Sequence, residues 1–305
     1  MAPVGEPAPS EKFLVVGKTG WIGQMCGEFL ESQGYSYAYA AFRLEEREKC
    51  EQELDNLKPT VVLNCAGLTG RPNVDWCETH RQEVIRANVL GMLNLIDCCF
   101  SRNIHVTNFG TGCIYHYDEG EHRYVSEGGR PFKEEDPANF FGSFYSRTKA
   151  VAEQLALEYP NVLNLRLRMP ISDDLSARNF IVKLTKYSRV VNIPNSVTVL
   201  HELLPVAISM SHRRLTGKYN FTNPGSISHN EVLKLYREYI DPNFQWKNFS
   251  LEEQAKILKA GRSNCELDVS KLLRDNPDAA VNDAHTAVKL ALLRTREKLD
   301  NHNSQ

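Results

Sequence analysis

The sequence has little net charge and no long apolar run. Its 36 Lys and Arg residues against 38 Asp and Glu leave a formal charge of −2, so no charge excess indicates binding to nucleic acid or to an anionic membrane surface. No apolar run approaches the roughly 18 residues that a membrane-spanning helix needs. Internal repeats, low-complexity blocks and linker-like stretches are also missing. By length, 305 residues make one or two domains.

The eight cysteines include no Cys-x-x-Cys pair and no neighbouring His cluster, so we predict no metal site. Residues 1–10 are rich in Pro, Ala and Gly and have no apolar core. This composition is typical of neither a signal peptide nor a transit peptide, and we expect a disordered tail. Reduced thiols and a cytoplasmic location are therefore expected.

The first half of the chain alternates strand and helix patterns. Predicted strands cover 12–16, 35–42, 60–65, 104–109 and 162–167, and predicted helices cover 21–33, 45–57, 79–100 and 142–159. This alternation predicts a doubly wound α/β fold with a parallel sheet, whose ligands bind at the carboxyl ends of the strands. After residue 170 the pattern loosens into helices at 176–187, 200–211, 229–239 and 283–299, and a strand at 217–222.

Three glycines follow the first predicted strand at the spacing G-x-x-G-x-x-G. Gly17, Gly20 and Gly23 would permit a tight turn, a close approach of the backbone to a pyrophosphate, and close packing of the helix on the strand. A chance glycine turn is the alternative, but the strand–turn–helix context favours a Rossmann dinucleotide site. A nucleotide triphosphatase phosphate loop is rejected because position 12 is lysine, not glycine. The surrounding residues expected to line the cofactor are Lys18, Thr19, Trp21 and Ile22.

The second predicted strand ends at Arg43 instead of an acidic residue. An arginine at this position suits the 2′-phosphate of NADP, whereas an acid would hold the ribose hydroxyls of NAD. We therefore predict NADPH as the cofactor, with NADH possible. Arg47 lies one helical turn further on and could assist, although a solvated helix face explains it equally well.

Tyr145 and Lys149 lie four residues apart and so share one helix face. A nearby ammonium stabilises a phenolate and lowers the pKa of the phenol, which could then protonate a carbonyl oxygen at neutral pH. An ordinary exposed Tyr/Lys pair is the common alternative. Thr111, at the end of an upstream strand, favours the catalytic interpretation.

These motifs resemble the extended short-chain dehydrogenase/reductases along nearly the whole chain. The resemblance includes Asn64-Cys-Ala-Gly67 and the late turn at 219–225. It implies that Asn64, Ala66, Gly67 and Pro170 line the cofactor, that Thr111 hydrogen-bonds the substrate oxygen, that Lys149 also holds the nicotinamide ribose and that Asn88 supports the proton relay. It also implies an NADP-binding domain at 11–170 and a smaller substrate-binding lid at 171–305, interwoven with the first.

Further stretches resemble the family of bifunctional nucleotide-rhamnose synthase/epimerase-reductases, namely 17–23, 69–78, 111–114, 142–149, 168–171, 179–183 and 220–268. The resemblance implies epimerisation of a nucleotide-4-keto-6-deoxyglucose at C3 and C5, followed by reduction at C4 with NADPH. A C4 ketone acidifies the hydrogens at C3 and C5, so an acid and a base suffice. Cys113, on the same side of an extended backbone as Thr111, is the expected base, and Lys183 is the expected acid. The alternatives are a core thiol and a surface lysine.

The substrate is expected to be UDP- or dTDP-4-keto-6-deoxyglucose, supplied by a separate 4,6-dehydratase, and the chain is expected to form a homodimer. Residues expected to bind the substrate are Thr69, Arg71, Asn73, Asp75, Asn179, Asn223, Arg262 and Asn264. Two rivals remain at this point. One is another extended epimerase or reductase, such as a 4-epimerase that keeps its NAD, and the other is a non-catalytic NADP-binding regulatory subunit.

Overall fold

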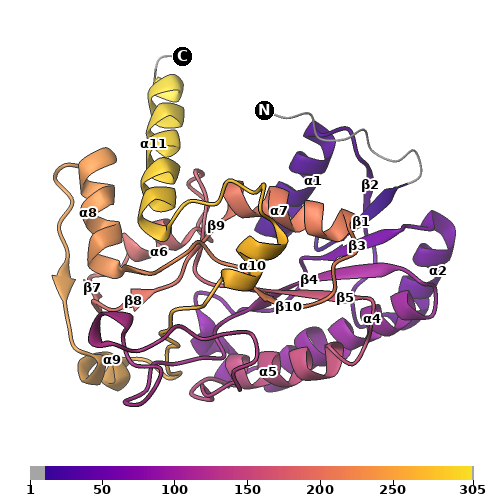
Figure 1. The fold of residues 1–305 in the computed structure, drawn as a ribbon, viewed down its shortest axis with the longest axis horizontal. Coiled ribbons are helices and arrows are strands. Elements are labelled where there is room, and N and C mark those ends of the chain that lie inside the picture. The colour runs from indigo at the N-terminus through magenta and orange to yellow at the C-terminus, as the bar shows by residue number, and fades with distance from the viewer. Residues whose placement is uncertain (1–10, 304–305) are drawn as a thin grey trace.

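The computed structural model describes residues 11–303, and the tail expected at 1–10 lies outside the described residues. Its centre is a six-stranded parallel sheet with the order β2-β1-β3-β4-β5-β10 (Figure 1). The strands are β1 Lys12–Val16, β2 Ser36–Tyr39, β3 Val61–Asn64, β4 His105–Thr111, β5 Val162–Leu167 and β10 Gly217–Asn220. The predicted α/β class is confirmed. The strand order reverses at β1, the point where ligands bind in such sheets.

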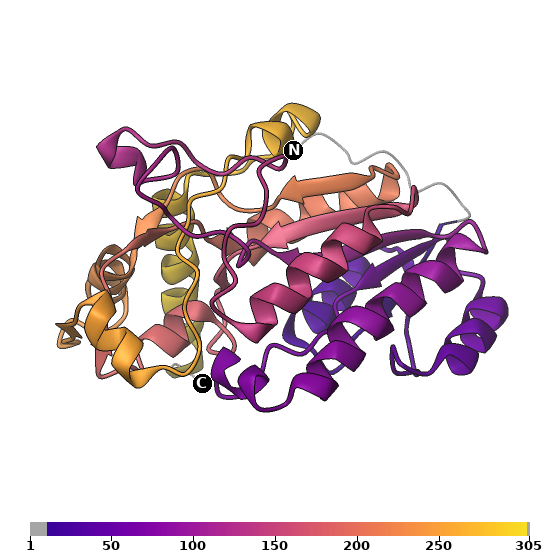
Figure 2. The same cartoon turned by 90° about the horizontal axis from the view of Figure 1, so that it is seen from below.

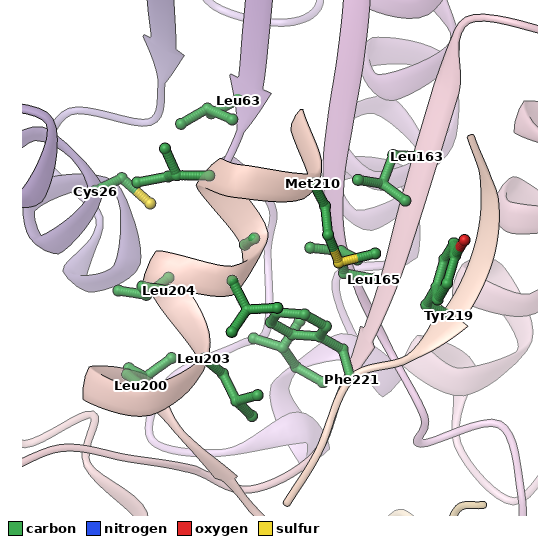
Figure 3. Close-up of a cluster of buried hydrophobic side chains, with 14 of the residues drawn as sticks. Cys26, Leu63, Leu163, Leu165, Leu200, Leu203, Leu204, Met210, Tyr219 and Phe221 are labelled. Carbon is green, nitrogen blue, oxygen red and sulfur yellow. The ribbon is translucent and has the colours of Figure 1, made fainter. Parts of the chain in front are cut away.

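Helices cover both faces of the sheet, which explains why β1 and β3 are nearly continuous apolar runs. The helices α1 Trp21–Ser32 and α7 Leu200–His212 pack on one face. In Figure 3, Leu200, Leu203 and Leu204 of α7 lie near Leu165 and Phe221. The other face carries α2 Arg47–Leu57, α4 Met92–Phe100 and α5 Phe144–Ala156.

The helix predicted at 79–100 is built from three successive segments. It begins with α3 Arg81–Ile85, passes through the π-helical turn η2 Arg86–Gly91, and continues as α4. Such π turns occur frequently at functional sites, and this one carries Asn88. Just before it, the 3₁₀ turn η1 Val74–Glu78 follows the loop that leaves β3.

The second half of the chain forms a further apolar core beside the sheet. It is built around α6 Phe180–Leu184, α8 His229–Tyr239 and α11 Ala284–Asn303. Figure 2 shows these helices, coloured salmon to yellow, gathered toward one end of the molecule. The remaining elements are β6 Pro170–Ile171, β7 Arg189–Val190, β8 Pro194–Asn195, β9 Thr198–Val199, β11 Ile227–Ser228, β12 Lys247–Asn248, α9 Leu251–Ile257, α10 Ser270–Asp275 and the 3₁₀ turn η3 Val125–Glu127.

The sheet itself is not confined to the first half. Strand β10 pairs with β5, and α7 covers the sheet beside it, although both come after residue 170. All eight cysteines are free thiols. Among residues 11–303, no helix is long and apolar enough to cross a membrane. The same residues contain no group of His, Cys, Asp or Glu that could hold a metal ion.

Candidate active site

The glycine turn after β1 leaves space that side chains would fill. Gly17 has φ +104, and a Cβ there would lie 3.0 Å from the backbone nitrogen of Ala66. A Cβ on Gly23 would lie 2.4 Å from the Gly17 carbonyl oxygen. Gly20 caps α1 without a side chain, so the first backbone N–H groups of the helix are not capped by it. This cradle fits the pyrophosphate of a dinucleotide.

The other residues of the glycine turn divide into two groups. Lys18 and Thr19 are exposed, so both side chains can reach a ligand. The Trp21 indole N–H instead donates to Asp174 Oδ2 at 2.7 Å, and Ile22 packs against the core under α1. Trp21 therefore ties the turn to the second half of the chain.

Arg43 follows β2 and is exposed, and its side chain forms no ion pair with any described residue. Its backbone N–H donates to Glu46 Oε2 at 3.0 Å, which fixes the turn. Arg47 is engaged differently, because it pairs with Glu51 at 2.9 Å and with Asp97 at 2.7 Å. Of the two arginines, Arg43 is thus the one available for a 2′-phosphate.

The loop that leaves β3 is held by two buried asparagines. Asn64 accepts a hydrogen bond from the Ala66 backbone N–H at 3.2 Å. Asn88 uses its amide oxygen and nitrogen on the backbone of Leu68, at 2.8 and 2.7 Å. A Cβ on Gly67 would lie 3.3 Å from the Asn88 amide oxygen. These contacts fix the loop that follows β3, at the carboxyl end of the sheet where the cofactor is expected. The proton-relay role of Asn88 stays a prediction.

Thr111, Cys113 and Tyr145 come together at the end of β4. The Thr111 hydroxyl accepts a hydrogen bond from the Cys113 backbone N–H at 3.0 Å. It also lies close enough to Tyr145 to oppose the effect of burial on the pKa of the phenol. Cys113 is also close enough to Tyr145 to act on it electrostatically. A proton donor and a thiol therefore face the same space.

Helix α5 presents Tyr145 and Lys149 because its first turn is firmly capped. Ser143 accepts from the Ser146 backbone N–H at 3.0 Å, and Glu78 accepts from the Phe144 backbone N–H at 2.6 Å. Glu78 belongs to η1, so the same contact joins the β3 loop to the helix. These two contacts fix the first turn of α5, and with it the position of Tyr145.

The electrostatics of Tyr145 differ from the sequence-based expectation. Burial, followed by the field of Cys113, raises the pKa of Tyr145 above its ordinary value, whereas the Lys149 ammonium was expected to lower it. Burial also lowers the pKa of Lys149, and the Glu153 carboxylate opposes that shift. The phenol pKa is therefore not lowered as expected, because removal from water disfavours the charged phenolate.

A series of hydrogen-bonded polar side chains connects Asn64 to Glu153, which lies one helical turn after Lys149. Asn64 donates to Asn108 at 2.9 Å, Asn108 donates to Asn164 at 2.6 Å, and Asn164 donates to Glu153 at 2.6 Å. Glu153 then pairs with buried Arg166. A small recess joins this series of side chains to the site, lined by Met92, Asn108, Gly110, Thr111, Lys149, Glu153 and Asn164.

Lys183 lies on α6, which is capped by Asn179. The Asn179 oxygen accepts from the Ile181 backbone N–H at 3.1 Å, and its nitrogen donates to the Ser172 and Asp174 carbonyls. Burial, then the charge of Arg178, lowers the pKa of Lys183. The Arg178 guanidinium lies 3.9 Å from where a Gly20 Cβ would be, so Arg178 links Lys183 to the glycine turn. No contact of the described residues joins Lys183 to Cys113.

Several residues predicted to bind substrate have protein partners. Asp75 pairs with Arg262 at 2.9 Å, so these two side chains join the β3 loop to the segment at 259–262. Asn73 caps η1, and Asn223 donates to Glu202 and to the Asn282 carbonyl.

The other predicted residues retain polar atoms without a partner or are open to solvent. The amide nitrogen of Asn264 is buried and has no hydrogen-bond partner among the described residues. Thr69 and Arg71 are exposed, and Pro170 is partly buried at the start of β6.

Fold and site together define an enzyme of the short-chain dehydrogenase/reductase type. The chain belongs to the NAD dependent epimerase/dehydratase family, whose model matches residues 13–171. It is 54% identical over 275 residues, covering 90% of each chain, to a bifunctional dTDP-4-dehydrorhamnose 3,5-epimerase/dTDP-4-dehydrorhamnose reductase of Arabidopsis thaliana. The expected family resemblance is confirmed.

Two further comparisons agree. The chain is 56% identical over 271 residues to a trifunctional UDP-glucose 4,6-dehydratase/UDP-4-keto-6-deoxy-D-glucose 3,5-epimerase/UDP-4-keto-L-rhamnose-reductase of the same plant. The match spans 88% of this chain but only 40% of that protein's length. The crystal structure of a UDP-rhamnose synthase from Acanthamoeba polyphaga mimivirus superposes with a TM-score of 0.87 at 40% identity, covering 93% of this chain and 99% of that one.

Sequence reasoning missed four residues that shape the site: Glu153, Arg168, Asp174 and Arg178. Two of them carried a signal. Arg168 directly follows the strand predicted at 162–167, and Glu153 lies four residues after Lys149, the helical spacing for neighbouring side chains. Asp174 and Arg178 lie in a loop, where nothing in the sequence separates them from solvated charges.

Proposed function

We propose that this chain is a bifunctional 3,5-epimerase and 4-reductase that converts a nucleotide-4-keto-6-deoxyglucose into the nucleotide-L-rhamnose. The observation that carries this proposal is the meeting of Thr111, Cys113 and Tyr145 at one strand end. A pure reductase needs the proton donor but not the thiol. The 54% identity to a plant enzyme named for both activities, over 90% of each chain, supports the same assignment.

NADPH is the proposed cofactor. The glycine turn would hold its pyrophosphate, and Arg43 would hold its 2′-phosphate. The arginine is exposed and without an ion pair among the described residues, which favours NADPH over NADH. When bound, the nicotinamide supplies the hydride that reduces C4.

Each of the other chemical steps is assigned to a particular side chain. Cys113 removes the proton from C3 or C5, the electron pair moves onto the C4 oxygen, and Lys183 returns a proton to the opposite face of the carbon. Its lowered pKa, caused by burial and by Arg178, helps Lys183 to release that proton. Thr111 binds the C4 oxygen, and Tyr145 protonates this oxygen during reduction.

We also propose the setting in which the enzyme works. A 4,6-dehydratase supplies the 4-keto substrate in the cytoplasm. Residues 11–170 form the NADP-binding domain, and residues 171–305 form the substrate-binding lid. A homodimer is supported by exposed apolar side chains on the adjacent segments η2, α4 and α5, namely Leu90, Phe100, Val151 and Leu155.

Incubation of the protein with UDP- or dTDP-4-keto-6-deoxyglucose and NADPH or NADH tests the proposal. Absorbance at 340 nm follows the cofactor, and NMR identifies the sugar. We expect nucleotide-L-rhamnose, formed faster with NADPH. A product that retains the gluco configuration at C3 and C5 would contradict the epimerase half of the proposal. Consumption of no cofactor with either sugar would favour a regulatory subunit.

Two variants separate the half-reactions. Tyr145→Phe should abolish NADPH oxidation but leave exchange of the C3 and C5 hydrogens with deuterated water. Cys113→Ser should lose this exchange and still bind NADPH, because the thiol is not part of the cofactor turn. Mass spectrometry measures the exchange, and wild-type deuterium incorporation in Cys113→Ser would remove this residue from the mechanism.

A further inference from the structure

Arg168, the residue that follows β5, is among the most deeply buried charges of the protein, with 1% of its surface exposed. Its Nη1 donates to Cys113 Sγ at 3.1 Å and to Ser263 Oγ at 2.7 Å. Its Nη2 donates to the Ser263 carbonyl oxygen at 3.1 Å and to Asn195 Oδ1. Every partner except the thiol is a neutral group that cannot ionise in the working pH range.

This guanidinium has no carboxylate to balance it. Within residues 11–303, Arg168 takes part in no salt bridge. Arg166, two residues earlier and also buried, is paired with Glu153. The two buried arginines therefore differ, because Arg166 has a carboxylate partner and Arg168 has none. Burying a charge without a counter-charge costs several kcal/mol. A negative charge on the sulfur of Cys113 would remove this penalty.

The other titratable groups around Arg168 are held neutral by burial. Burial raises the pKa of Cys265 to about 11 and raises the pKa of Tyr117 and Tyr145, and it lowers the pKa of His116 and lowers that of His229 to about 4. These groups face Arg168 or Cys113 from α5, α8, the loop after β4 and the segment around 265. Cys113 is only partly buried, and its sulfur is in direct contact with the Arg168 guanidinium.

We propose that Arg168 is a positioning residue that holds Cys113 as a thiolate, aimed at the substrate. The inference rests on the proposed function in one respect, because it explains how a thiol can act as the base in epimerisation at neutral pH. A guanidinium next to a cysteine favours the thiolate, whereas a cysteine without such a neighbour loses its proton at about pH 8.5. During the step, the C–H bond breaks, the proton passes to sulfur and the electron pair moves onto the C4 oxygen. The guanidinium stays bound to Ser263 and Asn195 throughout.

The test follows alkylation of Cys113 by iodoacetamide as a function of pH, in the full-length protein, with peptide mass spectrometry separating Cys113 from the other thiols. In the wild type, we expect a rate midpoint well below pH 8.5. In Arg168→Met the midpoint should rise by a unit or more, so that the rate at pH 7 falls about tenfold. Arg168→Lys keeps the charge and should lie between the two.

Arg166→Lys is the matched control, because it alters a buried guanidinium of the neighbouring strand position that does not contact Cys113. It should lower stability without moving the alkylation midpoint. Should Arg168→Met fail to fold, the wild-type profile still decides the matter. A wild-type midpoint at or above pH 8.5, or equal midpoints in wild type and Arg168→Met, would overturn the inference.

The same protein distinguishes this inference from the proposed function. A low alkylation midpoint together with undiminished C3 and C5 exchange in Cys113→Ser would overturn the epimerase role of Cys113, but it would support the charge pair. A high midpoint together with lost exchange in Cys113→Ser would overturn the charge pair and keep the base.

Discussion

Glu153 is the position at which one substitution tests both the stability of the sheet and the chemistry above it. Glu153→Gln keeps the shape of the side chain but removes its charge. Arg166, with 2% of its surface exposed, would then lose the carboxylate that accepts its Nε at 3.0 Å. Breaking a buried ion pair by removing one partner costs about 3–5 kcal/mol, so the free energy of unfolding should fall by that amount.

Urea unfolding followed by circular dichroism measures this loss. Asp55→Asn is the matched control, since Asp55 is 60% exposed and pairs with Arg102 at 2.7 Å on the surface. An exposed pair contributes about 0–1 kcal/mol. If Glu153→Gln proves no more destabilising than Asp55→Asn, the reasoning that Arg166 depends on this carboxylate is refuted.

The same variant should move the pH dependence of reduction. Burial lowers the pKa of Lys149, and the Glu153 carboxylate opposes that shift. A reaction that needs the Lys149 ammonium proceeds below this pKa and is lost as pH rises through it. Removing the carboxylate lowers the pKa further, so the alkaline limb of NADPH oxidation should move to lower pH. An unmoved limb would show that Glu153 does not act on Lys149.

Three other substitutions probe the cofactor turn and the substrate loop. Gly23→Ala would place a Cβ 2.4 Å from the Gly17 carbonyl oxygen, so the variant should lose NADPH binding, measured by NADPH fluorescence. A near-normal affinity would show that the backbone of the turn can shift to make room for the methyl group. Because the Arg178 guanidinium lies beside Gly20, we expect it to contact the cofactor pyrophosphate. Arg178→Leu should weaken NADPH binding about tenfold or more and weaken 2′,5′-ADP binding less, because this fragment has only one of the two phosphates. Equal losses for both ligands would contradict this contact. Asp75→Asn frees Arg262, so it should raise the KM for the sugar nucleotide with little change in unfolding free energy, about 1 kcal/mol or less, and an unchanged KM would count against the loop contact.

The elements whose apolar residues follow a clear strand or helix pattern were predictable. The strand at 12–16 and the helix at 229–239 have the predicted bounds. The short pairs such as β6 with β9 were missed because two-residue strands depend on tertiary contacts that leave no periodicity. The helix predicted at 176–187 is only Phe180–Leu184, since Asn179 caps it late and its amide holds the preceding loop.

The chemical residues were predictable where a motif carried them, and their supporting partners were not. Thr111 and Tyr145 meet as the strand–helix pattern indicates. The positions of Arg168 and Glu153 carried a signal, but the sequence does not show that Arg168 is buried without a carboxylate partner, because that depends on tertiary packing. Asn223 was predicted to bind the substrate, and its side-chain amide also bonds to Val199, Glu202 and Asn282. Its substrate role stays a prediction.

Strand β10 has a consequence for how the molecule is made. During synthesis, β5 leaves the ribosome long before residues 217–220. One edge of β5 therefore stays unpaired and open to solvent until residues 217–220 emerge. Such an edge invites pairing with other chains. A fragment that ends at residue 170 would keep this edge unpaired permanently. We expect such a fragment to aggregate during synthesis and not to fold as an independent cofactor-binding domain.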